Sequence, residues 1–174
     1  GEAPGKNEDL QGRPFVGQAG KLLDRLIESI GMTRDDVFIA NVLKCRPPGN
    51  RDPLPGEAEH HWPWLEEQIA VVDPKLIVLL GRHAMKRFLP QLRIGEAHGR
   101  VQDVDGRQML PVYHPAAALY NKSLEQTLFD DFAQIPGLIA GYILPCSLVY
   151  ILIVRLVSDR EKYSSPANMV LLVL

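Results

Sequence analysis

The sequence LIVLL at residues 76–80 is followed directly by Gly81 and then by a stretch near Ala84–Phe88 that favours a helix. A continuous apolar run of this length is typical of a parallel strand that is buried on both faces. Gly81 marks the break between the two elements. A buried strand that leads straight into a helix favours an α/β fold.

Further strand and helix patterns lie on both sides of this stretch. VFIANVL at 37–43 and MLPVY at 109–113 are short apolar runs that predict strands. The spacing of apolar residues predicts helices at 21–30, 57–72 and 124–132. Strands that alternate with helices predict an α/β layered domain with a largely parallel sheet.

The first twenty residues are rich in Gly and Pro, and we expect Gly1–Gly20 to be a long shaped loop without a regular element. Ligands of such sheets bind beyond the carboxyl ends of the strands. Three polar residues fall at these places: Glu2 in the opening loop, Asn41 late in one strand and His114 just after another. On residue type alone, Asn41 and His114 could equally have structural roles.

Length and composition are those of one compact domain, with 174 residues, a net charge of −2 and 46% apolar residues. These values exclude a disordered tail, a collagen-like fibre and a disulfide-stapled miniature. Cys45 and Cys146 lie far apart, which favours a reducing, cytoplasmic location. Because the net charge is near zero, a nucleic acid would have to be met by a local basic patch.

The C-terminal part of the chain differs in composition from the rest. Residues 137–157 are nearly all apolar and long enough to span a membrane, but Pro145 and Arg155 argue against a span. A buried terminal helix or hairpin, or a tail that is foreign to the domain, are the alternatives. We therefore expect a domain at 1–137 and an atypical apolar tail at 138–174, with membrane attachment through 138–157 the less favoured reading.

Four segments together carry a resemblance to a known family. They are GEAPGKNEDLQGRPFVGQAGKLLD at 1–24, ANVLKCRPPGNRDPLP at 40–55, LIVLLGRHAM at 76–85 and YHPAAAL at 113–119. In this order and separation they resemble the family 4, iron–sulfur uracil-DNA glycosylases. The resemblance implies a three-layer α/β/α sandwich with a central, mainly parallel four-stranded sheet. The strand that precedes the GEAPG motif in the family is expected to be missing or incomplete here, as if the N-terminus were truncated.

The resemblance also implies roles for individual residues. Such an enzyme holds a base that has been flipped out of the duplex. Phe15 would stack on uracil, Asn41 would read its polar edge, and His114 would stabilise negative charge on the departing base. Glu2 would position or activate water. Glu8 resembles the position that blocks the 5-methyl group of thymine, although it could equally belong to a solvated turn.

DNA contacts are expected from the loops that carry the motifs. Lys44, Arg46 and Arg51 would form a local basic rim, together with Lys6 and Arg13. Leu119 would be a wedge in the gap left by the flipped base, although packing on the next helix explains it almost as well.

Members of this family hold a 4Fe–4S cluster with four cysteines. Cys45 matches the third ligand position, and His61 occupies the position of the fourth. Two upstream cysteines have no counterpart, and Cys146 in the tail is interpreted as a small buried hydrophobe. The resemblance therefore implies a cluster in the full-length family, which we expect to be absent or incomplete in this chain.

The predicted function is a base excision repair hydrolase that releases free uracil from DNA and leaves an abasic site. We expect it to work as a monomer in the cytoplasm. The alternative is a catalytically impaired, truncated family member that only binds DNA or uracil.

Overall fold

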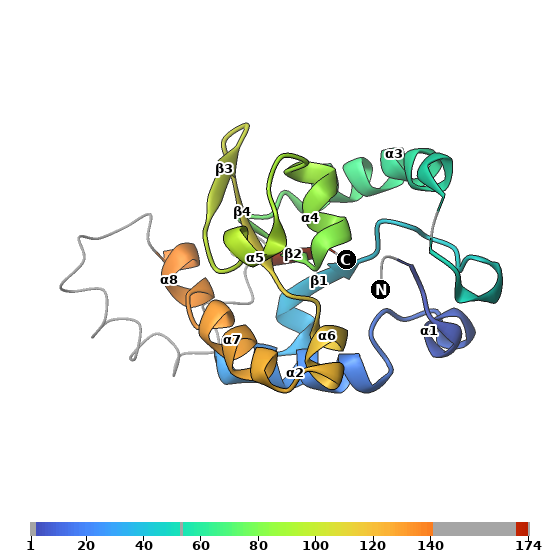
Figure 1. Cartoon of the computed structure of the whole chain (residues 1–174). Helices are drawn as coiled ribbons and strands as arrows, with labels where there is room; N and C mark the ends of the chain where they lie inside the picture. The colour runs from blue at the N-terminus through green and yellow to red at the C-terminus, as the bar shows by residue number, and fades with distance from the viewer. Residues whose placement is uncertain (1–2, 53, 141–169, 174) are drawn as a thin grey trace.

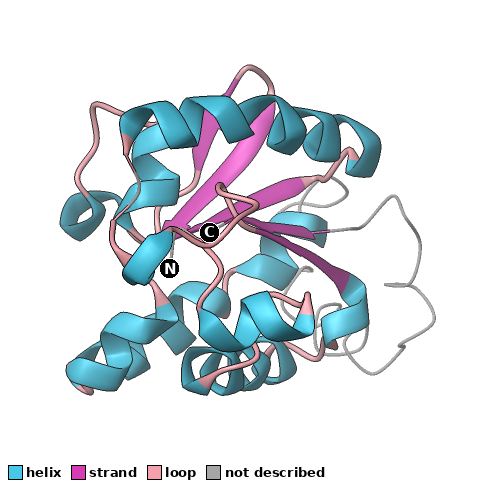
Figure 2. Ribbon diagram, turned by 90° about the vertical axis from the view of Figure 1, so that its right-hand side faces the viewer, coloured by secondary structure: helices cyan, strands magenta, loops and turns pink. Residues whose placement is uncertain are grey.

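The computed structural model describes residues 3–52, 54–140 and 170–173, in which a five-stranded sheet lies between two layers of helices (Figures 1 and 2). The strand order is β1-β5-β2-β4-β3, and all neighbours are parallel except β4 and β3. The strands are β1 (Val37–Ala40), β2 (Leu76–Leu80), β3 (Gln102–Val104), β4 (Arg107–Val112) and β5 (Val170–Val173). The predicted α/β sandwich with a mainly parallel sheet is confirmed.

The helices divide between the two faces of the sheet. One face packs against α2 (Gln18–Ser29), α6 (Pro115–Tyr120), α7 (Ser123–Phe132) and α8 (Ile135–Ala140). The other face packs against α3 (Pro55–Val72), α4 (Arg82–Phe88) and α5 (Ile94–Ala97). A short helix, α1 (Lys6–Gln11), precedes α2, and two 3₁₀ turns, η1 (Arg34–Asp36) and η2 (Pro48–Asn50), lie in the loops.

Strand β2 has the bounds that the sequence predicts and is buried at all five positions. Val78 and Leu80 pack into the core beside α2, whereas Ile77 and Leu79 pack into the core beside α3 and α4. Because successive side chains point to opposite faces, a strand that is covered on both sides must be apolar throughout.

The opening segment differs from the prediction of a loop without regular structure, because α1 occupies residues 6–11. The sequence KNEDLQ contains residues that tolerate a helix well, and Glu8 and Asp9 lie in its first turn, where negative charge is favourable. Glycines at residues 5 and 12 flank the helix and confine it to six residues. The surrounding Gly and Pro residues concealed this short element.

The sheet has five strands instead of the four expected. The antiparallel edge strand β3 forms a hairpin with β4 through Asp105 and Gly106. An Asp-Gly pair between short strands is a recognised hairpin signal, because both residues adopt positive φ in such turns. The Asp105-Gly106 pair could therefore have predicted this hairpin from the sequence.

The second additional strand, β5, lies in the centre of the sheet between β1 and β2 (Figure 1). Leu172 pairs with Ile39 on one side and Val78 on the other. It comes from the segment 138–174 that composition sets apart as a tail, and α8 crosses the boundary at residue 137. A segment that composition sets apart from the domain thus supplies a central strand of the sheet.

The remaining residues of that segment, 141–169, lie outside the described residues, and Pro145, Cys146 and Arg155 are among them. No helix in the described part of the chain has the length and apolar character needed to cross a membrane.

Candidate active site

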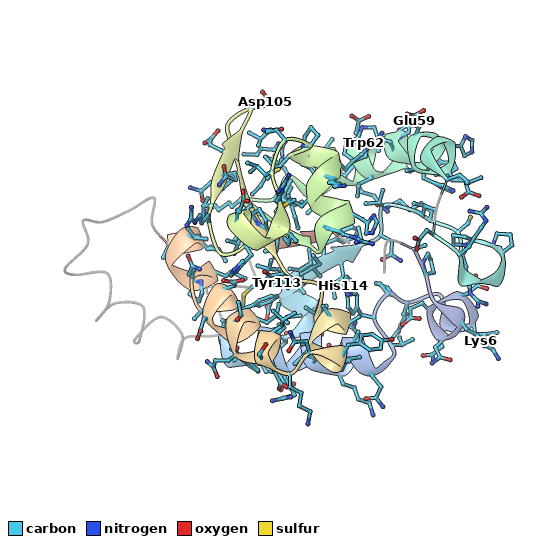
Figure 3. All side chains as sticks on the ribbon, viewed as in Figure 1. Lys6, Glu59, Trp62, Asp105, Tyr113 and His114 are labelled. Atoms are coloured by element: carbon cyan, nitrogen blue, oxygen red, sulfur yellow. The ribbon has the colours of Figure 1, made fainter. Side chains whose placement is uncertain are left out.

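Three segments bring the predicted site residues together at the carboxyl edge of the sheet. Asn41 follows β1, His114 joins β4 to α6, and Phe15 lies in the turn before α2; Figure 3 labels His114. They line one pocket of about 280 Å³, to which Glu8 and Leu119 also contribute. Sequence reasoning placed these five residues in one site, and the fold gathers them there.

Phe15 adopts the left-handed conformation, with φ of 55°, which is uncommon for a residue with a side chain. Arg34 Nη2 donates hydrogen bonds to the carbonyl oxygens of Pro14 and Phe15, each at 2.8 Å. Gly20 permits the close approach of α2, because a Cβ atom there would lie 1.9 Å from the Phe15 oxygen. Hydrogen bonds from Arg34 and close packing at Gly20 therefore fix the conformation of this turn.

The result of this turn is a fixed aromatic face inside the pocket. The rings of Phe15 and His114 are stacked, with centroids 5.5 Å apart and planes 21° from parallel. The side chain of Phe15 is buried.

Glu8 makes hydrogen bonds that stabilise the same turn. Its Oε1 accepts from the backbone N–H groups of Val16 and Gly17, at 3.0 and 3.2 Å. These bonds join α1 to the start of α2 and fix the carboxylate at the wall of the pocket. Exclusion of a 5-methyl group by Glu8 stays a prediction.

The imidazole of His114 is held in one tautomer. Nδ1 accepts a hydrogen bond from the backbone N–H of Ala116 at 3.0 Å, so the proton of the neutral ring is on Nε2. Burial lowers the pKa of His114 to about 3. At neutral pH this side chain is therefore an uncharged hydrogen-bond donor.

Gly81 allows the end of β2 to pack closely against His114. Its φ is +90°, and a Cβ atom there would lie 2.9 Å from the Cβ of His114. Sequence reasoning identified Gly81 only as the break between strand and helix. Its contact with His114 could not be read from a single sequence, because the two residues follow different strands.

Lys44 reaches inward beneath Asn41. Its Nζ donates to the backbone oxygen of Asn41 at 2.8 Å and to Oε1 of Gln68. Burial lowers the pKa of Lys44 to about 8. This side chain therefore braces the residue expected to read uracil, and its predicted DNA contact stays a prediction.

The other predicted DNA contacts differ in their surroundings. Arg51 forms a two-point ion pair with Glu57, at 2.8 and 2.7 Å. Arg46 is partly buried in the same loop, and Leu119 is 48% exposed beside the pocket. Glu2, the predicted water-positioning residue, lies outside the described residues.

Two candidate cluster ligands are described, and they differ in burial. Cys45 is exposed, whereas His61 is buried and its Nδ1 has no hydrogen-bond partner among the described residues. Such an orphaned nitrogen fits a ligand position. However, no group of three or more His, Cys, Asp or Glu side chains in the described ranges could hold a metal ion. These residues do not fit a cluster that needs four ligands.

Residues 1–135, which contain every part of this pocket, match the family model of the uracil DNA glycosylase superfamily. The chain belongs to this superfamily. Among the superfamily's curated members, it is 48% identical to the type-4 uracil-DNA glycosylase of Sulfurisphaera tokodaii, over 78% of this chain and 66% of that protein.

Other type-4 members of the superfamily are similarly close in sequence to this chain. The chain is 46% identical to the type-4 enzyme of Archaeoglobus fulgidus and 42% identical to that of Thermotoga maritima; 78% and 77% of this chain align, and 72% of each relative is covered. A type-5 uracil-DNA glycosylase of Pyrobaculum aerophilum is 32% identical over 60% of this chain. The chain is thus a type-4 superfamily member that spans about two thirds of the length of its curated relatives.

Proposed function

We propose that this chain hydrolyses the N-glycosidic bond between uracil and deoxyribose in DNA, releasing uracil and leaving an abasic site. The observation that carries the proposal is the pocket in which Phe15, Asn41 and a neutral His114 meet. The names of the type-4 relatives support it.

In the proposed reaction, uracil enters the pocket after it leaves the base stack. It lies against the ring of Phe15, where stacking contributes about 1–3 kcal/mol per base. The amide of Asn41 pairs with N3–H and O4 of uracil, a donor and acceptor pattern that cytosine does not present. Asn41 is therefore the residue that selects the base.

Bond cleavage leaves negative charge on uracil O2. The Nε2–H group of His114 donates to this oxygen, and a fixed donor in a buried site stabilises charge as it develops. The neutral ring donates without carrying its own positive charge. Glu2 would position water and support the cationic sugar, as the family resemblance implies.

Contacts with the DNA strand complete the proposal. Arg46, Arg51 and Lys44 would bind the phosphate backbone around the pocket. Leu119 would enter the gap left by the flipped base, and its 48% exposure supports this role.

The test is an assay with single- and double-stranded oligonucleotides that contain one uracil. The wild-type chain should produce alkali-labile abasic sites, and Asn41→Ala and His114→Ala should each reduce the rate by about 100-fold or more. His60→Ala, which removes an exposed imidazole, is the control and should retain activity. A folded wild-type sample that binds the DNA but releases no uracil would favour the alternative, a member that only binds.

We also propose that the family's cluster is absent or incomplete in this chain. Cys45 is the one described thiol, and His61 holds the next ligand position. Iron and sulfide analysis of the purified chain should find less than four irons per molecule. A full complement, lost in Cys45→Ser, would contradict this. We further propose that the protein is a monomer and acts in the cytoplasm. Size-exclusion chromatography tests whether it is monomeric.

A further inference from the structure

A second, larger cavity of about 620 Å³ adjoins the uracil pocket. The two share Ala3, His114 and Ala116 as lining residues. The larger cavity extends over the ends of β2 and β4, and Arg82 and Tyr120 are among its lining residues. One continuation of the uracil pocket therefore runs past His114 into this space.

The wall formed by the start of α4 is positively charged. Arg82 Nε donates to Nε2 of His83 at 2.9 Å. Burial lowers the pKa of His83, so its ring is neutral at neutral pH and accepts this hydrogen bond. Arg82 has no carboxylate within ion-pair distance in the described part of the chain, whereas Arg51, which also lines the cavity, is paired with Glu57. The charge of Arg82 is therefore available to an anion in the cavity.

An exposed aromatic side chain also lines the cavity. Tyr120 is the last residue of α6 and is 92% exposed. It lies six positions after His114, which corresponds to a rise of about 9 Å along a helix. Tyr120 lines the larger cavity and not the pocket that holds Phe15, so it offers a stacking surface to a group other than the uracil.

We propose that this cavity receives the nucleotide that adjoins the uridine in the same DNA strand, with its phosphate at Arg82 and its base against Tyr120. A nucleotide combines an anion with an aromatic face, which are the two features that the cavity offers. The inference rests on the proposed function, because the uridine in the first pocket fixes the position of its neighbour.

A fluorescent base tests the contact without catalysis. Single-stranded oligonucleotides would carry 2′-fluoro-2′-deoxyuridine, whose glycosidic bond resists cleavage, with 2-aminopurine on its 5′ side in one and on its 3′ side in the other. Binding of the wild-type chain should change the fluorescence of one probe. The change should be lost in Tyr120→Ala and retained in Trp64→Ala, which removes an exposed aromatic side chain of α3.

Kinetics test the charge. With uracil-containing single strands, Tyr120→Ala and Arg82→Gln should each raise KM by about 10-fold and leave kcat within about twofold. Arg82→Gln should also reduce the slope of log affinity against log salt by about one phosphate contact. Arg100→Gln, an exposed arginine outside the cavity, should change neither quantity.

The two proposals fail differently. If the wild-type chain releases no uracil, the proposed function is wrong, whatever the fluorescence shows. If it releases uracil but both 2-aminopurine probes respond equally in wild type and Tyr120→Ala, or KM is unchanged in both variants, the inference about the cavity is wrong and the proposed function stands.

Discussion

The imidazole of His114 combines burial with a fixed hydrogen bond at Nδ1. Burial alone would leave the tautomer open, and the bond from Ala116 alone would not prevent protonation. Together they keep a neutral ring with its proton on Nε2. This state is what a donor to a developing anion requires, because it is preorganised before the substrate arrives.

The lowered pKa of His114 makes stability depend on pH. The pKa of His114 is about 3 in the folded chain and near 6.5 in the unfolded chain. As pH falls, the imidazole is therefore protonated in the unfolded chain before it is protonated in the folded chain. Stability should therefore fall as pH drops from about 6.5 toward 3, by up to ~1.4 kcal/mol per pH unit. Urea unfolding between pH 7 and 4 should show a smaller loss in His114→Gln than in wild type. Equal slopes would show that His114 titrates normally.

Arg34 is a positioning residue for Phe15. In Arg34→Gln, two hydrogen bonds to the turn are lost, and we expect stability to fall by about 1–3 kcal/mol. The KM for uracil-containing DNA should rise more than kcat falls, because the stacking face is displaced and His114 remains in place. Arg25→Gln, which removes an exposed ion pair with Glu125, is the matched control. A purely structural role would lower stability without changing KM.

At the scale of elements, the site depends on where strands end. Asn41 follows β1, His114 follows β4, and β2 ends just before Gly81, which lies beside His114. Parallel strands present their carboxyl ends at one edge, so residues distant in sequence meet without long loops.

Gly81→Ala should disturb this edge. The new Cβ meets His114 at 2.9 Å, and a φ of +90° is strained for alanine. We expect a stability loss of at least about 1 kcal/mol and at least a 10-fold loss of uracil release. The control is Gly106→Ala, where φ is +80° but no neighbour lies within 4 Å. That variant should lose stability and retain activity; loss of activity in both would point to general unfolding.

The sequence predicted those elements that a short run of neighbouring residues is enough to specify. LIVLL at 76–80 is buried on both faces and could be recognised as a strand, and the polar residues at strand ends gave Asn41 and His114. Arg34 could not be found, because its bonds to Pro14 and Phe15 join segments about twenty residues apart and depend on the turn geometry. The pairing of β5 could not be found either, because the run VLLV specifies a strand but not its neighbours.

On the scale of the whole molecule, the centre of the sheet is built by two distant parts of the chain. β1 and β2 each pair with β5, so neither is hydrogen-bonded to the other. Leu172 is 1% exposed in the core beside α2, and Val173 is fully buried in the core on the other face. This strand therefore contributes to both layers.

Truncation of one β5 side chain measures that contribution. Leu172→Ala should lower the free energy of unfolding by about 2–5 kcal/mol, because it removes buried methyl groups and leaves a cavity. Leu54→Ala, at a 57% exposed leucine, should change it by less than about 0.5 kcal/mol. Chemical denaturation followed by circular dichroism would make the comparison. Equal stability of the two variants would show that β5 does not pack in the sheet in solution.

The central position of β5 also bears on how the protein acquires its fold during translation. A ribosome makes residues 37–80 long before residues 170–173, so β1 and β2 emerge without the strand that joins them. Pairing over such sequence separations is slow, and unpaired strand edges promote aggregation. Nascent chains of this protein should therefore need protection by chaperones until β5 leaves the exit tunnel.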